Sequence, residues 1–368
     1  MARIVLGVGT SHSPMLTLRP DQWEEYAAGD RTNDELVYPP EGVIRTFEEG
    51  LRHLPDHVRK RSGTIEEYRR LHAACQGALD QLGAAMRGAE LDAVVIVSDD
   101  QDEWFFEDNM PVFAVYWGDD VKILPRPMPR PRSPEIAAAI RAGYGDEERI
   151  HPCHPKLGRH LVEGLVARRF DVAHLTYRPP VAGGRVVRRY PTLDGESALV
   201  RETAPRPIGL PHGFSFVVKR LLHNMEIPIV PVFQNTCYPP NHVSPRRAYD
   251  FGAALGETLA EYPDDLRVAV VASGGLSHFV VDEELDRALL DALRRGDAAA
   301  LRAMPRHRMY SATSESMNWI ALGGAVAGTS LEMELIDYVP VYRTEAATGG
   351  GWAFALWQEP TRDAERSG

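Results

Sequence analysis

The sequence predicts an α/β fold with a central, mostly parallel or mixed sheet and helices on both faces. Three runs rich in Val, Ile and Ala predict strands at residues 4–8, 91–97 and 267–272. Continuous apolar character of this kind is typical of strands covered on both sides. Segments with helical spacing of apolar residues separate the runs, and such alternation favours a helix-covered sheet. We therefore expect one elaborated catalytic domain over residues 1–368.

Two long segments interrupt the regular alternation of strands and helices. Residues 15–62 are polar and contain prolines, which predicts a lid or insertion over a site. Residues 176–207 are rich in Arg, Pro and Gly, which predicts a surface excursion. The remaining expected elements are a helix at 64–87, a strand at 111–117, helices at 134–143, 155–168 and 213–224, a strand at 227–233, helices at 244–261, 282–304 and 313–327, and strands at 332–342 and 352–357.

Composition narrows the class of ligand. The chain carries 41 Lys and Arg against 52 Asp and Glu, a formal net charge of -11, which argues against nucleic acid or an anionic membrane as partner. A small-molecule ligand is expected instead. Three scattered cysteines and the absence of a long apolar run predict a cytoplasmic protein without a membrane span. Homo-oligomers are common among soluble assemblies, and we expect one here.

Three predicted strands end in residues that can carry chemistry. The first ends at Ser11-His12, the second at Ser98-Asp99-Asp100-Gln101, and the third reaches Ser277-His278 through two glycines. Loops at sheet edges are where α/β proteins place their functional side chains, so the two histidines predict one shared site. The alternative is that each is an ordinary loop histidine.

Two further residues are ambiguous when considered alone. Glu315 follows Ser and Thr residues at an expected helix start, which fits either a helix-capping role or the carboxylate of a two-histidine-one-carboxylate metal site. His212 also precedes an expected helix, where a surface or capping role is common. The sequence contains no GxSxG, Walker A or GxGxxG motif.

Five motifs occur in order along the chain: Gly9-Thr10-Ser11-His12-Ser13-Pro14, His154-Pro155-Lys156-Leu157, Pro211-His212-Gly213, Ala272-Ser273-Gly274-Gly275-Leu276-Ser277-His278 and Thr313-Ser314-Glu315. Together they resemble those of a known family, the class III extradiol ring-cleavage dioxygenases of the protocatechuate 4,5-dioxygenase β-subunit type. The resemblance implies a non-haem Fe(II), a small aromatic substrate of catechol or gallate type, and O2. It implies that His12 and Glu315 bind the metal, that His278 is the catalytic acid/base, and that His212 lies beside the substrate pocket.

The chain departs from the family pattern at one metal ligand. Gln101 stands where the second histidine ligand is expected, and an amide oxygen is a weaker donor to Fe(II) than imidazole. A subgroup similar to methylgallate dioxygenases carries the same Asp-Asp-Gln. Substitutes for the missing histidine are His57, His53 or His72, or a carboxylate of Asp99, Asp100 or Asp102.

Two other functions therefore stay open beside the oxygenase. One is a metal-binding or interaction protein without oxygenase activity, built on the same scaffold. The other is a zinc hydrolase that uses the same histidines, although the sequence offers no firm set of three ligands for zinc.

Overall fold

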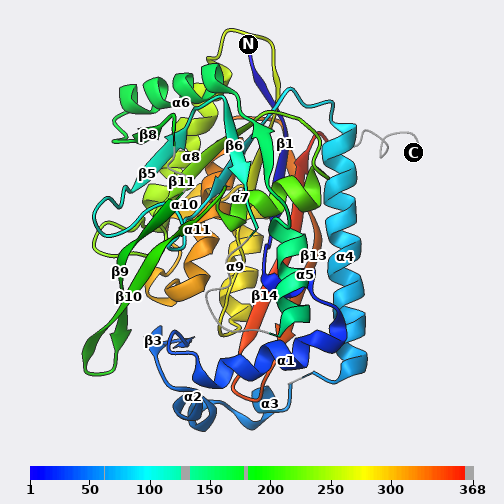
Figure 1. Cartoon of the computed structure of the whole chain (residues 1–368), viewed down its shortest axis with the longest axis vertical. Helices are drawn as coiled ribbons and strands as arrows, with labels where there is room; N and C mark the ends of the chain where they lie inside the picture. Colours follow the sequence, from blue (N-terminus) through cyan, green and yellow to red (C-terminus); the bar gives the residue numbers. More distant parts are fainter. Residues whose placement is uncertain (62, 126–132, 178–180, 361–368) are drawn as a thin grey trace.

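The computed structural model describes residues 1–61, 63–125, 133–177 and 181–360 (Figure 1). An eight-stranded sheet forms its centre, in the order β13-β14-β1-β12-β4-β11-β5-β8. The strands are β1 (Arg3–Thr10), β4 (Ala93–Ser98), β5 (Phe113–Tyr116), β8 (Ala173–Leu175), β11 (Ile229–Gln234), β12 (Arg267–Ser273), β13 (Glu332–Tyr342) and β14 (Gly349–Gln358).

The middle of this sheet is parallel and its flanks are mixed. β1, β12, β4 and β11 run in the same direction, whereas β14 pairs antiparallel with β1 and β5 pairs antiparallel with β11. Side chains of the central strands alternate between the two faces, so that Ile96 packs into one core and Val95 and Val97 into the other. The carboxyl ends of the four parallel strands consequently meet at one edge of the sheet.

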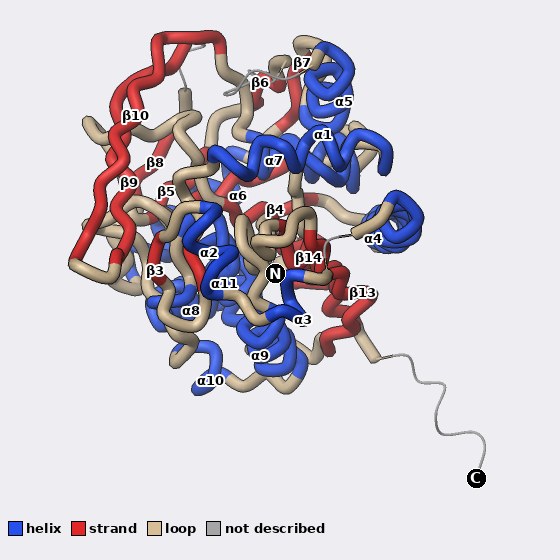
Figure 2. Tube along the Cα trace, turned by 90° about the horizontal axis from the view of Figure 1, so that it is seen from below, coloured by secondary structure: helices blue, strands red, loops and turns tan. Residues whose placement is uncertain are grey.

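Helices cover both faces, which confirms the predicted α/β architecture (Figure 2). One face packs against α4 (Ile65–Gly88), α5 (Pro134–Tyr144) and α7 (His212–Phe216). The other packs against α6 (Pro155–Ala167), α8 (Pro245–Ala260), α9 (Glu283–Arg294), α10 (Ala298–Arg302) and α11 (Ser316–Val326). No helix in the described ranges combines the length and apolarity that crossing a bilayer requires.

The segment expected as an insertion contains more regular structure than its polar sequence indicates. It forms α1 (Trp23–Ala28), α2 (Phe47–His53), α3 (Asp56–Arg59) and the short strand pair β2 (Val37–Tyr38) and β3 (Val43–Ile44). At α2 the Thr46 hydroxyl accepts from the Glu49 N–H while the Glu49 carboxylate accepts from the Thr46 N–H, a capping box. These helices lie across the end of the molecule toward which β1 runs (Figure 1).

The predicted surface excursion is a long β-hairpin. β9 (Val181–Thr192) and β10 (Gly195–Pro207) pair antiparallel around the two-residue turn Leu193-Asp194, with Thr192 opposite Gly195. The sequence prediction did not identify this hairpin. The hairpin stands beside the same end of the sheet as α1 and α2 (Figures 1 and 2).

A buried carboxylate fastens the insertion to this hairpin. Glu35 accepts hydrogen bonds from Arg188 Nη1 at 2.6 Å, Arg201 Nη2 at 2.7 Å and the Tyr190 hydroxyl at 2.5 Å. Arg188 also donates from Nη2 to Asp102 at 3.0 Å, which connects the hairpin to the loop after β4. The three segments are thus joined by one ionic network that is largely removed from water.

We expect the stability contributed by Glu35 to depend on pH. Burial raises the pKa of Glu35, but Arg188 and Arg201 outweigh this effect and lower it from 4.5 to about 2. The contribution is therefore present above pH 4.5 and is lost as the pH falls toward 2. In urea unfolding, Glu35→Gln should cost about 3 kcal/mol near neutral pH and almost nothing near pH 2.

Glu196→Gln is the matched control, because Glu196 forms an exposed pair with Arg189 on the same hairpin. This substitution should change the free energy of unfolding little at any pH. A cost of Glu35→Gln that stays constant between neutral pH and pH 3 would contradict the account.

Candidate active site

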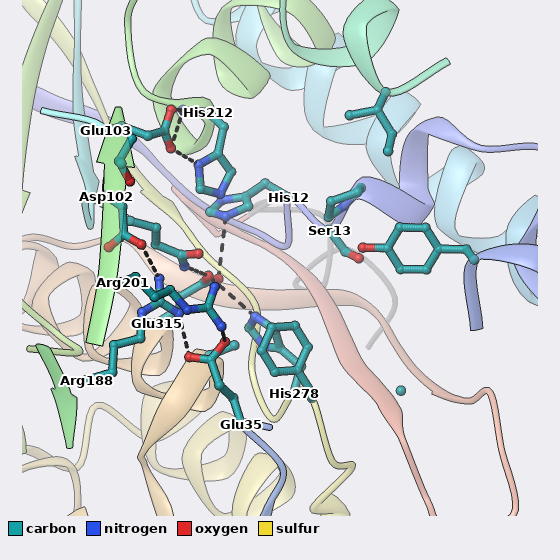
Figure 3. A pocket seen from close by; sticks show the side chains of 18 of the residues that line it. His12, Ser13, Glu35, Asp102, Glu103, Arg188, Arg201, His212, His278 and Glu315 are labelled. Carbon is teal, nitrogen blue, oxygen red and sulfur yellow. Dashed lines mark hydrogen bonds and ion pairs between the residues drawn. The ribbon is translucent and has the colours of Figure 1, made fainter. Parts of the chain in front are cut away.

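Side chains from four places in the sequence meet at the carboxyl edge of the parallel strands. His12 follows β1, residues 99–103 follow β4, and His278 lies in the loop after β12. Glu315 ends the short 3-10 helix η6 (Ser311–Glu315), which leads into α11. The structure therefore brings the two strand-end histidines to one place, together with the glutamate (Figure 3).

Glu315 is the centre of this cluster. Its carboxylate lies 3.5 Å from His12 Nε2 and 3.4 Å from His278 Nε2, and only 2% of the residue is exposed. It also accepts the backbone N–H of Gly275 at 2.6 Å and the side-chain amide of Gln101 at 2.5 Å. The carboxylate is thus used in the site and does not cap a helix.

The two histidines determine the charge of this carboxylate. Burial raises the pKa of Glu315, but His278 and His12 outweigh it and hold the pKa well below its usual range. Burial lowers the pKa of His278, yet the facing Glu315 carboxylate raises it overall. The Nδ1 of His278 lies 2.9 Å from the Leu276 carbonyl, which can only accept, so Nδ1 carries a proton.

The tautomer of His12 follows from its neighbours. The Ser273 hydroxyl donates to the Gly213 carbonyl at 2.6 Å and must therefore accept from His12 Nδ1, which lies 3.0 Å away. In neutral His12 the lone pair is then on Nε2, a buried atom that has no hydrogen-bond partner among the described residues. A lone pair that faces the Glu315 carboxylate is unfavourable unless a proton or a metal cation lies between them.

Gln101 occupies the position of the expected third ligand and acts here as a hydrogen-bond donor. Its Nε2 donates to Asp99 at 3.2 Å as well as to Glu315. Asn318 donates to the other oxygen of Asp99 at 3.0 Å. Burial, together with the Glu315 carboxylate, raises the pKa of Asp99 to about 6. The amide group of Gln101 thus holds two neighbouring carboxyl groups together.

The loop that carries Gln101 is shaped by Asp100. Its buried carboxylate accepts the backbone N–H groups of residues 103–105 at 2.8–3.2 Å. Asp102 has a φ of 61°, the left-handed region that Asp tolerates better than most residues. This turn brings the three successive residues 101–103 to the wall of one cavity.

His212 lies against His12 at the start of α7. The two rings meet edge to face, with centroids 4.8 Å apart. Glu103 forms an ion pair with His212 Nδ1 and accepts the His212 backbone N–H at 3.1 Å, which fixes the orientation of the ring (Figure 3). The sequence prediction included His212 but missed Glu103.

The alternative histidines are not close to this cluster. His53 and His57 are exposed on α2 and α3, and His72 packs against Trp23. None of the three is among the described residues that line the cavity. Across the described ranges, no group of three or more His, Cys, Asp and Glu side chains is arranged to hold a metal ion. His12 and Glu315 are therefore a pair of candidate ligands, with an amide in the third position.

A cavity of about 510 Å³ opens on this cluster. The hairpin contributes part of its wall, including Arg188, Arg201 and Arg206, so residues 181–207 are more than a surface excursion. The insertion contributes Tyr26 and Glu35. Apolar surface comes from Ile140, Phe279 and Trp352. Sequence reasoning missed these residues, because their side chains reach the cavity only through tertiary contacts.

Comparison with known proteins agrees with the resemblance drawn from the motifs. Residues 51–349 match the family model described as the catalytic LigB subunit of aromatic ring-opening dioxygenase, a range that contains Gln101, His212, His278 and Glu315 and begins after His12. A gallate dioxygenase of Pseudomonas putida (strain KT2440) is 29% identical over 150 residues, which are 38% of this chain and 35% of that protein. The alignment thus spans about a third of the length of this relative. Because the family match covers most of the sequence, the chain belongs to the family of catalytic LigB subunits of aromatic ring-opening dioxygenases.

Proposed function

We propose that the protein is an Fe(II)-dependent extradiol-type dioxygenase that opens the ring of a catechol or gallate-like aromatic compound with O2. The observation that carries the proposal is the buried Glu315 carboxylate, which faces the Nε2 atoms of His12 and His278 at the cavity. Family membership and the similarity to a gallate dioxygenase support it.

His12 and Glu315 would hold the iron. Among the residues that the structure describes, His12 Nε2 has no hydrogen-bond partner, and the lowered pKa of Glu315 keeps the facing carboxylate ionised, so this pair fits a divalent cation. Bound Fe(II) would supply a Lewis acid that lowers the pKa of a phenol and leaves positions open for O2. Ser273 keeps His12 in the tautomer that a metal ligand requires, since it accepts the Nδ1 proton.

His278 would take the proton of a substrate hydroxyl. In the absence of a cation its imidazolium form is favoured by Glu315. Once Glu315 shares its charge with a cation, this preference weakens and Nε2 of His278 can accept a proton. His212, fixed by Glu103 and in contact with His12, would lie beside the oxygen atoms of substrate or O2.

A second function is favoured by one observation, the amide of Gln101 in a ligand position. A protein that binds metal weakly, or binds a partner through the same cavity, would not need a third strong ligand. The two functions differ in oxygen consumption. Anaerobic iron loading followed by oxygen-electrode measurements with a panel of catechols and gallates separates them, and no uptake with any member would exclude the oxygenase.

We expect His12→Ala and Glu315→Ala to abolish iron binding. After anaerobic loading and removal of free metal, elemental analysis should find about one iron per wild-type chain. It should find much less in either variant, because each variant lacks one of the two proposed iron ligands. His57→Ala is the control, since His57 is exposed on α3. Loss of iron in His57→Ala with full iron in His12→Ala would reverse the assignment.

We expect His278→Gln to lose catalysis and keep its iron. Removing an acid/base group lowers the rate by about 10²- to 10⁴-fold, whereas the metal pair is untouched. Oxygen uptake and iron content should be measured on the same preparation, with His53→Gln on exposed α2 as the control. Unchanged turnover in His278→Gln would show that the acid/base lies elsewhere.

A further inference from the structure

Asp286, in the first turn of α9, is a buried carboxylate that the proposed chemistry does not use. The residue is 1% exposed. Among the described residues no Lys, Arg or His side chain forms an ion pair with it, and the adjoining Arg287 pairs with Glu283 and lies over the ring of Tyr338. A buried charge without an ionic partner is unfavourable, so its presence calls for a physical reason.

The carboxylate of Asp286 holds Ser277 at two points. Oδ1 accepts the backbone N–H of Ser277 at 2.8 Å, and Oδ2 accepts the Ser277 hydroxyl at 2.6 Å. The same hydroxyl accepts the backbone N–H of Asp282 at 2.8 Å, which leaves its hydrogen free to donate to Asp286. Tyr338 of β13 donates to Oδ2 at 2.8 Å. The groups around the carboxylate are therefore donors, as its ionised form requires.

The backbone of β14 fits closely around the same carboxylate. A Cβ atom built on Gly351 would lie 1.9 Å from Oδ2 of Asp286, so a side chain at this position would displace the carboxylate. The N–H of Gly351 also donates to the carbonyl of Ser277 at 2.8 Å. Ser277 is consequently fixed from both α9 and β14.

Ser277 directly precedes His278, the proposed acid/base. The His278 ring turns back over its own loop, with Nδ1 2.9 Å from the carbonyl of Leu276. The ring lies so close to Gly275 that a Cβ atom there would be 2.6 Å from Cε1 of His278. Because the loop and the ring pack together in this way, a shift of Ser277 would move Nε2, which lies 3.4 Å from Glu315.

The ionised form of Asp286 is unfavourable for stability. Burial raises the pKa of this carboxyl from 3.8 to about 7, against the hydrogen bonds from Ser277 and Tyr338, which lower it, and the nearby charge of Asp282 raises it further. A group that lowers stability and at the same time holds the segment of a reactive side chain is typical of functional sites.

We propose that Asp286 is a positioning residue for His278, and that through Ser277 it holds the imidazole where it can take the proton of a substrate hydroxyl. The inference rests on the proposed function. Asp286 is not among the described residues that line the cavity, so its effect on the reaction passes through Ser277 and His278.

A double-mutant cycle tests this role. Asp286→Asn should lower kcat for catechol by about 10-fold in the wild-type background, with KM and iron content little changed, because proton transfer to His278 becomes less efficient. In the His278→Gln background the same substitution should lower kcat by less than about 2-fold, because the group that Asp286 positions is already absent. Equal losses in the two backgrounds would overturn the proposal.

Two single variants complete the cycle. Ser277→Ala removes the hydroxyl without changing a charge and should lower kcat in the same way as Asp286→Asn. Asp291→Asn is the matched control, since Asp291 is exposed on the same helix and pairs with Arg294, and it should behave as wild type. A loss in Asp291→Asn as large as in Asp286→Asn, or unchanged kcat in both Asp286→Asn and Ser277→Ala, would contradict the role.

Unfolding in urea separates positioning from a purely structural contribution. Because the folded-state pKa of Asp286 is raised to about 7, its cost is present above this pH and disappears as the pH falls through it. The urea midpoint of Asp286→Asn should therefore be at or above that of wild type near pH 8 and match it near pH 5. A midpoint well below that of wild type near pH 8 would make Asp286 a structural residue and refute the proposal.

A crystal structure of Asp286→Asn gives a readout that does not depend on turnover. His278 Nε2 should lie farther from Glu315 than in the wild-type protein, or its ring should occupy two rotamers. If no catechol is turned over by the wild type, the proposed oxygenase function fails, while the position of His278 still decides the role of Asp286. A His278 ring that stays in one unchanged position would exclude that role.

Discussion

The site depends on one interaction, the burial of the Glu315 carboxylate between the imidazoles of His12 and His278. A carboxylate that is 2% exposed is unfavourable unless positive charge or hydrogen-bond donors surround it. Here two imidazoles, one backbone N–H and the amide of Gln101 provide both. In neutral His12 the same arrangement directs the Nε2 lone pair at this carboxylate, which is the reason for proposing a cation between them.

The surrounding structure fixes the geometry of that interaction at three points. Ser273 sets the tautomer of His12, Asp100 folds the loop after β4, and Glu103 orients His212. Outside this cluster, the Glu35 network joins the insertion and the hairpin to the same loop. The insertion and the hairpin, which interrupt the α/β pattern, thereby form part of the cavity wall, and the hairpin supplies Arg188, Arg201 and Arg206 to it.

Much of the fold could be predicted from the sequence, because apolar runs and helical spacing report local structure directly. The pairing of His12 with His278 also followed from local pattern, since both end strands of the parallel core. Glu315 was ambiguous in sequence, because a glutamate after Ser and Thr at a helix start is as suitable for capping as for ligation. Glu103 was out of reach, since its role depends on contact with His212, 109 positions away in the sequence.

Anomalous X-ray diffraction at the iron edge, on crystals loaded anaerobically with Fe(II), would locate the metal. We expect one iron peak in the cavity, with His12 Nε2 and a Glu315 oxygen at about 2.0–2.2 Å from it. A water molecule, or the Gln101 side chain in a different rotamer, would complete the coordination of the iron. His278 would not be a ligand. An iron that lies more than about 3 Å from both His12 and Glu315 would show that these residues are not its ligands.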